Sequence, residues 1–256
     1  MERARILLVP SLTELEWTIR PLLEEWADVA AYDGPGIGGE PPAEGPRTDA
    51  TARRGLDELD RRGWERCVVV GDAFGIGAAS LLAAARPAAV QGLVLGHALI
   101  SFSRGGKRPA LNAAVTDAYA QLAEMYPRAF VRHDLRTWRG QGGASTSAEA
   151  HDFAETYLAR VSDEATVDFH RELTENEREL EPRLRSALRG LDAPLLLVEH
   201  EGCLVCTPEG YQDVVAAFPE AARAKTAAKP SIDPAFAEIL RGFCQRIARE
   251  PAASHR

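Results

Sequence analysis

The strongest constraint on the fold is a repeated alternation between short apolar runs and longer amphipathic segments. The runs have the length of β-strands, and the longer segments repeat apolar residues at helical spacing. The expected strands are Arg5–Val9, Val29–Tyr32, Arg66–Gly71, Gly92–Gly96, Pro194–Glu199 and Arg223–Ala227. The expected helices are Leu15–Trp26, Thr48–Trp64, Phe74–Arg86, Pro208–Phe218 and Pro234–Ile247. This repetition predicts an α/β fold with a doubly wound, mostly parallel sheet.

The alternation stops between residues 100 and 190. This stretch has no obvious strand, is dense in charged residues and contains a flexible loop at Gly140–Ser147. Its apolar spacing predicts two further helices, His151–Val161 and Glu164–Leu188. We therefore expect one sheet domain, built from residues 1–99 and 191–256, with a helical insertion at residues 100–190.

The composition narrows the class of function. The chain of 256 residues has a formal net charge of −8, which argues against a nucleic-acid partner. It has no apolar run long enough to span a membrane, and its first apolar run is too short for a signal peptide. Four cysteines without a pairing pattern suit a reducing compartment, so we expect a cytoplasmic protein. Cys203 and Cys206 lack the second pair that a zinc site needs, so we expect no metal and no other cofactor.

Six local sequences, in order along the chain, resemble those of the α/β-hydrolase fold superfamily. They are Leu7–Trp17, Tyr32–Gly38, Gly71–Gly75, Arg86–Leu95, Asp192–Val198 and Leu204–Glu209. In that family the first carries the oxyanion loop, the third is the nucleophile elbow, and the fifth is the strand before the catalytic acid. The resemblance covers almost the whole chain. It implies that the insertion at residues 100–190 is the family's helical cap.

By the same resemblance, the chain lacks all three members of the family's catalytic triad. Ala73 stands at the nucleophile position, and a methyl group cannot attack a carbonyl carbon. The position of the acid falls on Gly202, with Glu199 and Glu201 close enough to replace it after a shift of register. Only the C-terminal tail carries a histidine after the last strand, where the family places its base. Because triad members act as a unit, we expect no Ser–His–acid hydrolysis.

The resemblance also implies a ligand pocket between the core and the cap, beside the elbow. Its oxyanion donors would be backbone N–H groups, one from Phe74 at a helix start and one from the loop at Ser11 and Leu12. Ala73 and Phe74 would line the pocket. The alternative for Phe74 is that its ring only packs under the cap.

Two side chains are candidates for acid–base catalysis in such a pocket. Asp72 directly precedes Ala73, and His97 follows the strand Gly92–Gly96 at the edge where open α/β sheets bind ligands. The alternative for Asp72 is a carboxylate that the dipole of the following helix favours. The alternative for His97, which is also a candidate ligand contact, is a hydrogen-bonded loop histidine.

The leading hypothesis is a triad-less α/β-hydrolase-like protein that binds a small organic molecule under its cap without hydrolysing it. One alternative is a non-hydrolytic lyase, isomerase or cyclase of bacterial secondary metabolism, a source that the Ala- and Arg-rich composition suggests. Others are a hydrolase with relocated catalytic residues and an interaction module. A homodimer is common for this fold, although nothing in the sequence specifies one.

Overall fold

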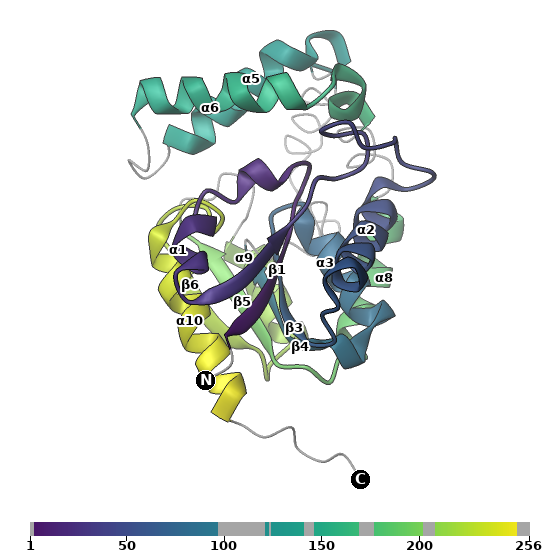
Figure 1. Cartoon of the computed structure of the whole chain (residues 1–256), viewed down its shortest axis with the longest axis vertical. Coiled ribbons are helices and arrows are strands. Elements are labelled where there is room, and N and C mark those ends of the chain that lie inside the picture. Colours follow the sequence, from purple (N-terminus) through teal and green to yellow (C-terminus); the bar gives the residue numbers. More distant parts are fainter. Residues whose placement is uncertain are drawn as a thin grey trace.

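The computed structural model describes residues 3–96, 121–122, 124–140, 146–168, 177–201 and 208–249. In these residues six parallel strands form one sheet in the order β2-β1-β3-β4-β5-β6 (Figure 1). They are β1 (Ala4–Val9), β2 (Ala27–Ala31), β3 (Cys67–Asp72), β4 (Val90–Gly96), β5 (Leu195–His200) and β6 (Ala222–Thr226). The predicted α/β class and parallel sheet are confirmed, and every expected strand lies within a few residues of its predicted place.

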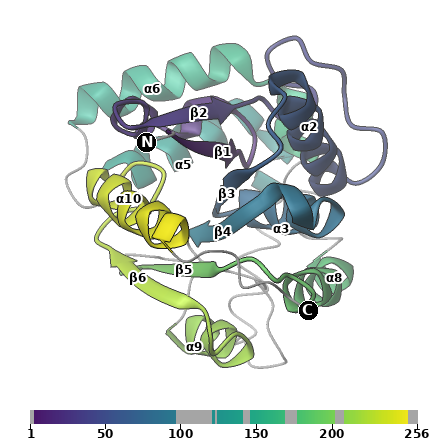
Figure 2. The ribbon, with the colours of Figure 1, turned by 60° about the horizontal axis from the view of Figure 1, so that its bottom comes forward.

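Helices cover both faces of the sheet (Figure 2). One face carries α2 (Arg47–Arg62), α3 (Gly75–Ala85), α8 (Glu177–Arg189) and α9 (Pro208–Ala217), and the other carries α1 (Arg20–Glu24) and α10 (Pro234–Arg249). Neighbouring residues of a strand point to opposite faces, so Leu7 packs in the first layer and Leu8 in the second. Two covered faces explain why a central strand such as β3 is a continuous apolar run from Cys67 to Val70.

The helix expected at Leu15–Trp26 is wrong in part. The structure has a 3₁₀ turn at Glu14–Glu16, then the non-helical residue Trp17 (φ −87°, ψ 68°), and then the short helix α1. The reason is the Glu16 side chain, which turns back to the backbone that precedes it and ends the first turn. The apolar spacing that suggested one helix instead buries Ile19 and Leu23 under the sheet.

Two helices of the insertion, α5 (Pro127–Gly140) and α6 (Ser147–Arg160), lie side by side across the carboxyl ends of the strands (Figure 1). We call this pair the cap. It packs on the loops below through a cluster that includes Leu12, Ile37, Leu135, Tyr157 and Leu158.

The helix α8 also falls within the insertion, but it packs against α3 through Leu184 and Leu188. We therefore place α8 with the helix layer of the sheet and not with the cap. The middle of the expected helix Glu164–Leu188 lies outside the described residues.

The order of the strands reverses between β1 and β3, because the chain runs from β1 to β2 on one side and then returns to β3 on the other. Ligands of open α/β sheets bind at the carboxyl edge of such a reversal. The loop after β1 and the turn after β3 meet at this point, under the cap. In the part of the chain that the structure describes, every helix is too short or too polar to cross a lipid bilayer.

Candidate functional site

The turn from β3 into α3 has the backbone of a nucleophile elbow. Ala73 has φ of 49°, and among the described residues it alone adopts a positive φ without being glycine. A residue in this left-handed region costs roughly 1–2 kcal/mol, so the surrounding packing must impose it. Gly71 and Gly75 allow that packing. A Cβ at Gly71 would lie 2.7 Å from the Cβ of Ala79, and one at Gly75 would lie 2.6 Å from the carbonyl oxygen of Val9.

The side chain at the apex of this turn is the methyl group of Ala73. The backbone N–H of Ala73 donates to the carbonyl of Gly96 at 3.2 Å, which ties the turn to β4. The Ala73 side chain is buried. Phe74 caps the start of α3 and is half-buried, with its ring packed against the cap cluster. The elbow therefore positions an apolar surface under the cap.

The loop after β1 carries the other expected oxyanion donors, and the structure shows what binds them. The N–H groups of Ser11 and Leu12 donate to the carboxylate of Glu16 at 3.0 and 2.9 Å, and that of Thr13 donates at 3.3 Å. Glu16 is 5% exposed. An oxyanion at this loop would thus compete with a carboxylate of the chain itself.

The cap reaches the same loop with two polar side chains. The hydroxyl of Tyr157, on α6, donates to Glu16 at 3.4 Å. Arg160, at the end of α6, pairs with Asp33 at 2.5 Å and with Glu14 at 3.2 Å. The ion pair with Asp33 raises the pKa of the Arg160 guanidinium above its ordinary value. These bonds join the cap, the loop after β1 and the loop after β2.

Asp72 is the last residue of β3 and directly precedes Ala73. Its carboxylate is buried and accepts the N–H of Ser231 at 3.0 Å, in the loop between β6 and α10. A Cβ on Gly96 would come within 3.0 Å of the Asp72 carboxylate, so the absence of a side chain at Gly96 makes room for it. The structure thus gives Asp72 the role of an anchor for the β6–α10 loop.

A buried histidine belongs to the same group. His200 ends β5 and is 5% exposed. Burial lowers its pKa, the nearby Lys229 lowers it further, and Asp72 and Asp233 act in the opposite direction. Asp233 itself accepts N–H groups from Ala227, Ala228 and Ala235, and so fixes the start of α10. We call Asp72, His200 and Ser231 the rear cluster.

Several predicted site residues are not brought to the elbow, and others cannot be placed. Glu199 forms an ion pair with Lys225 at 3.1 Å on the side of α9, because it alternates with His200 along β5. Glu201 is exposed. His97 and Gly202, like Cys203 and Cys206, lie outside the described residues.

Sequence reasoning missed Glu16 and gave His200 no specific role. The spacing Thr13-x-x-Glu16 is the signature of a capping box and was the available signal for Glu16. His200 could be placed only once the strand order was known, since Asp72 and His200 come from strands that are distant in the sequence.

The two described cysteines are poor candidates for a relocated nucleophile. Cys67 and Cys244 are buried, and burial raises the pKa of each thiol to about 12. A thiol with so high a pKa holds almost no thiolate near neutral pH, and the thiolate is the reactive form.

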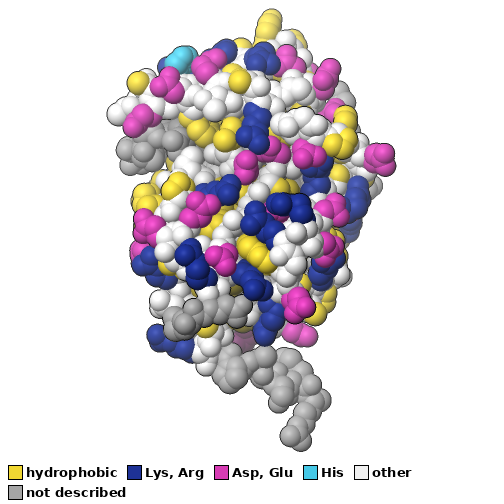
Figure 3. Space-filling view, in the orientation of Figure 1, with side chains coloured by type: hydrophobic (Ala, Val, Ile, Leu, Met, Phe, Trp, Pro, Cys, Tyr) yellow, Lys and Arg dark blue, Asp and Glu magenta, His cyan; other side chains and the backbone are white. Residues whose placement is uncertain are grey.

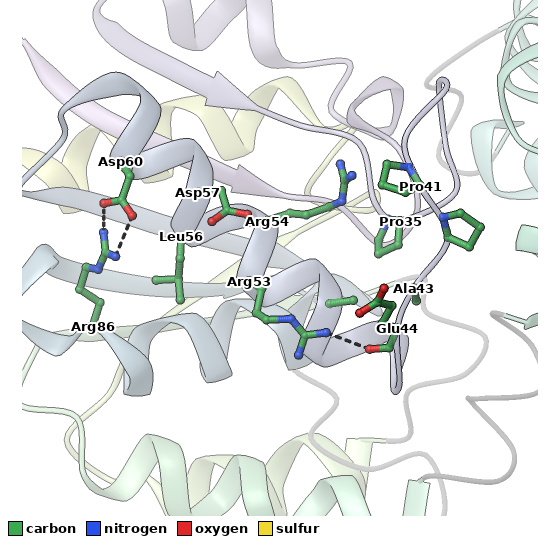
Figure 4. Close-up of a pocket in the computed structure, with 12 residues that line it drawn as sticks. Pro35, Pro41, Ala43, Glu44, Arg53, Arg54, Leu56, Asp57, Asp60 and Arg86 are labelled. Atoms are coloured by element: carbon green, nitrogen blue, oxygen red, sulfur yellow. Dashed lines mark hydrogen bonds and ion pairs between the residues drawn. The ribbon is translucent and has the colours of Figure 1, made fainter.

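Two surface grooves lie away from the elbow. One, of about 400 Å³, is bordered by the Pro35–Glu44 loop and α2 (Figure 4), where Arg86 pairs with Asp60 and Arg53 donates to the backbone carbonyl of Glu44. The other, of about 540 Å³, is lined by Glu199, Tyr211, Gln212, Val215, Arg223, Ala224 and Lys225. Basic and acidic side chains are interspersed over the face shown in Figure 3. Neither groove includes an elbow residue.

The six-stranded parallel sheet with helices on both faces is that of the α/β-hydrolase fold, and comparison with solved structures confirms this fold. No protein-family profile matches the sequence, and no curated protein sequence is significantly similar to it. Among the solved structures that share the fold over nearly the full chain are the following three.

A candidate epoxide hydrolase from Pseudomonas aeruginosa has a TM-score of 0.73 and 20% identity, covering 96% of this chain and 90% of that chain. A haloalkane dehalogenase loop variant from Bradyrhizobium elkanii has a TM-score of 0.71 and 18% identity, covering 99% and 91%. An enol-lactonase from Burkholderia xenovorans has a TM-score of 0.69 and 16% identity, covering 97% and 91%. At these sequence identities the structural similarity shows a shared fold and nothing more.

Proposed function

We propose that this chain binds a small organic molecule between its core and its cap, and that it does not hydrolyse esters by Ser–His–acid chemistry. The observation that carries the proposal is Ala73. The strained elbow is retained, with φ of 49°, while the side chain at its apex has no atom that can form an acyl intermediate. A pocket without a nucleophile can bind a molecule and leave it intact.

Three features support binding in preference to turnover. The ring of Phe74 is half-buried against the cap cluster and gives the elbow an apolar surface. The amides of the loop after β1 are bonded to Glu16, so they do not polarise a substrate carbonyl while that contact lasts. The carboxylate of Asp72, one of the two candidate acid–base groups, accepts the backbone N–H of Ser231 and is held by the β6–α10 loop.

Native mass spectrometry of protein purified from its source cells tests the proposal. We expect a small molecule that stays bound in the intact protein and is released on denaturation. Phe74→Ala should lose this molecule, whereas Tyr126→Ala, which alters an aromatic ring that is 62% exposed on the cap side of the chain, should retain it. Protein that carries no molecule, or equal retention by both variants, would overturn the proposal.

A second measurement addresses hydrolysis. Wild type and Ala73→Ser should both leave p-nitrophenyl acetate unchanged beyond the buffer rate, because a serine alone lacks the base that activates it. Turnover by wild type that survives purification and disappears in Asp72→Asn would instead establish a hydrolase with relocated residues.

A further inference from the structure

The strand β6 forms an open edge of the sheet. Among the described residues it pairs with β5 alone, and α9 lies beside it (Figure 2). The carbonyl of Thr226 accepts the N–H of Glu201 at 3.0 Å, so the backbone groups of Thr226 point to β5. Because alternate residues of a strand direct these groups to opposite sides, the N–H and C=O groups of Arg223 and Lys225 point away from the sheet. Such an edge is a template for a further strand.

The side chains of this edge carry positive charge toward a groove. Lys225 pairs with Glu199 at 3.1 Å on the side of α9, yet its side chain remains 62% exposed. Arg223 lies two residues earlier and therefore points to the same side. It is exposed and makes no ion pair with any residue that the structure describes. The groove of about 540 Å³ beside both cations is also lined by the buried Tyr211 and Val215. Arg223 is therefore available to an acidic partner.

Charges on an edge strand hinder some partners and select others. Two copies of β6 paired antiparallel about Ala224 would set Arg223 of one copy opposite Lys225 of the other, and like charges so placed are destabilising. An acidic strand would instead bring carboxylates to these positions, where cross-strand side chains lie about 5 Å apart. Its intervening side chains would lie on the other face, beside the small, partly buried side chains of Ala222 and Ala224. The edge therefore fits a segment that alternates acidic and apolar residues.

We propose that the free edge of β6 binds an extended acidic segment of a partner protein. The segment adds to the sheet as a further strand, with carboxylates at alternate positions set against Arg223 and Lys225. In such strand addition the backbone hydrogen bonds supply affinity and the side chains supply specificity. The strands β4 and β5 lie between this edge and the elbow that follows β3, so the inference does not rest on the ligand proposed above.

Fluorescence anisotropy of a labelled peptide that alternates glutamate and valine tests this edge on the full chain. We expect saturable binding, and none for a peptide in which lysine replaces glutamate. Arg223→Glu should weaken the affinity by about tenfold or more, because it sets like charges against each other. Arg66→Glu is the matched control, since Arg66 is also exposed and undergoes the same change of charge but precedes β3. It should change the affinity by less than about twofold.

Two further peptides, N-methylated at every glutamate or at every valine, separate strand addition from attraction between charges. They carry the same charge, but alternate N–H groups of a strand point to opposite edges, so only one set can face β6. One peptide should lose about tenfold or more in affinity, and the other should bind as the unmethylated peptide does. This comparison uses the unaltered chain, so it stands even if Arg223→Glu does not fold.

The inference is overturned if the wild-type chain does not bind the acidic peptide, which would mean that the two cations only protect the edge. Equal affinities of the two N-methylated peptides, or equal effects of Arg223→Glu and Arg66→Glu, would likewise overturn it. A dimer of the chain that excludes the peptide would assign the edge to a second copy instead. None of these outcomes depends on a retained pocket ligand, so this test and that of the proposed function fail independently.

Discussion

Two groups of buried polar residues near the elbow are bonded in different ways. On the cap side, the carboxylates of Glu16 and Asp33 are met by backbone amides, by hydroxyls and by Arg160. In the second group, the rear cluster brings an aspartate and a histidine together with Ser231, whose hydroxyl is buried and has no hydrogen-bond partner in the described structure. The carboxylates on the cap side each accept several donors, whereas the hydroxyl of Ser231 is buried without a partner in the described residues. Removing a carboxylate of either group should therefore lower the stability, whereas removing the Ser231 hydroxyl can raise it.

The largest effect should come from the elbow near both groups. Gly75→Ala places a Cβ 2.6 Å from the carbonyl oxygen of Val9 and 3.1 Å from backbone atoms of Pro10, which cannot move without opening the sheet. We expect a loss of roughly 3 kcal/mol in the free energy of unfolding, measured by urea denaturation. Gly242→Ala is the control, because its Cβ meets open space on α10, and it should stabilise by about 0.5–1 kcal/mol. Equal stability of the two variants would show that the elbow backbone is not fixed as described.

The next effect concerns the anchor of the rear cluster. Asp72→Asn keeps an oxygen that can accept the Ser231 N–H but removes its charge, and we expect a loss of about 1–3 kcal/mol in the same measurement. Asp28→Asn is the matched control, because Asp28 is half-exposed on β2 in an ion pair with Arg3, and it should change stability by less than about 1 kcal/mol. A loss for Asp72→Asn no larger than that for Asp28→Asn would remove the anchor role.

The strands and the elbow are the parts of the structure that the sequence could predict. The strands were predictable because both faces of the sheet are covered, so that segments such as Cys67–Val70 are continuous apolar runs bounded by polar or glycine residues. The elbow was predictable because its glycines and its alanine lie within five consecutive residues. Local spacing was enough for both.

The turn at Glu16 and the rear cluster could not be predicted, because both depend on contacts that residue spacing does not report. The apolar spacing of Leu15, Ile19 and Leu23 predicts a helix, but the backbone N–H groups that capture Glu16 override it, and spacing does not report where a carboxylate turns. The neighbourhood of Asp72 and His200 follows from the strand order and from which face each strand end points to. The sequence of a single strand gives neither the strand order nor the neighbours of its last residue.

The stability of the folded chain should also depend on pH through His200 of the rear cluster. Burial lowers the pKa of His200 below its usual 6.5, so the unfolded chain binds this proton more readily than the folded chain does. The contribution of neutral His200 to the free energy of unfolding is therefore fully present above about pH 6.5. It is lost as the pH falls through the lowered pKa. Unfolding free energies measured between pH 8 and pH 4 should fall more steeply for wild type than for His200→Gln.

Asp72→Asn provides a second test of this pH dependence. Asp72 raises the pKa of His200, against burial and Lys229, so neutralising it should lower that pKa further and enlarge the loss in acid. Parallel pH profiles for wild type and His200→Gln would mean that His200 is not the group that titrates.

The smallest expected change in the free energy of unfolding comes from the hydroxyl of Ser231. Ser231→Ala removes a hydroxyl that is buried without a partner, and leaves the backbone N–H of residue 231 bonded to Asp72. Because an unsatisfied buried hydroxyl costs free energy, we expect this variant to be neutral or more stable by up to about 1 kcal/mol. Thr226→Val is the matched control, since it also removes one buried hydroxyl, but one that donates to the carbonyl of Glu199 at 3.4 Å, and it should lose about 0.5–1 kcal/mol. Opposite signs for the two variants would confirm that the hydroxyl of Ser231 is unsatisfied in the folded chain. A loss in both would mean that Ser231 is bonded in solution, and the two groups near the elbow would then differ only in which residues do the bonding.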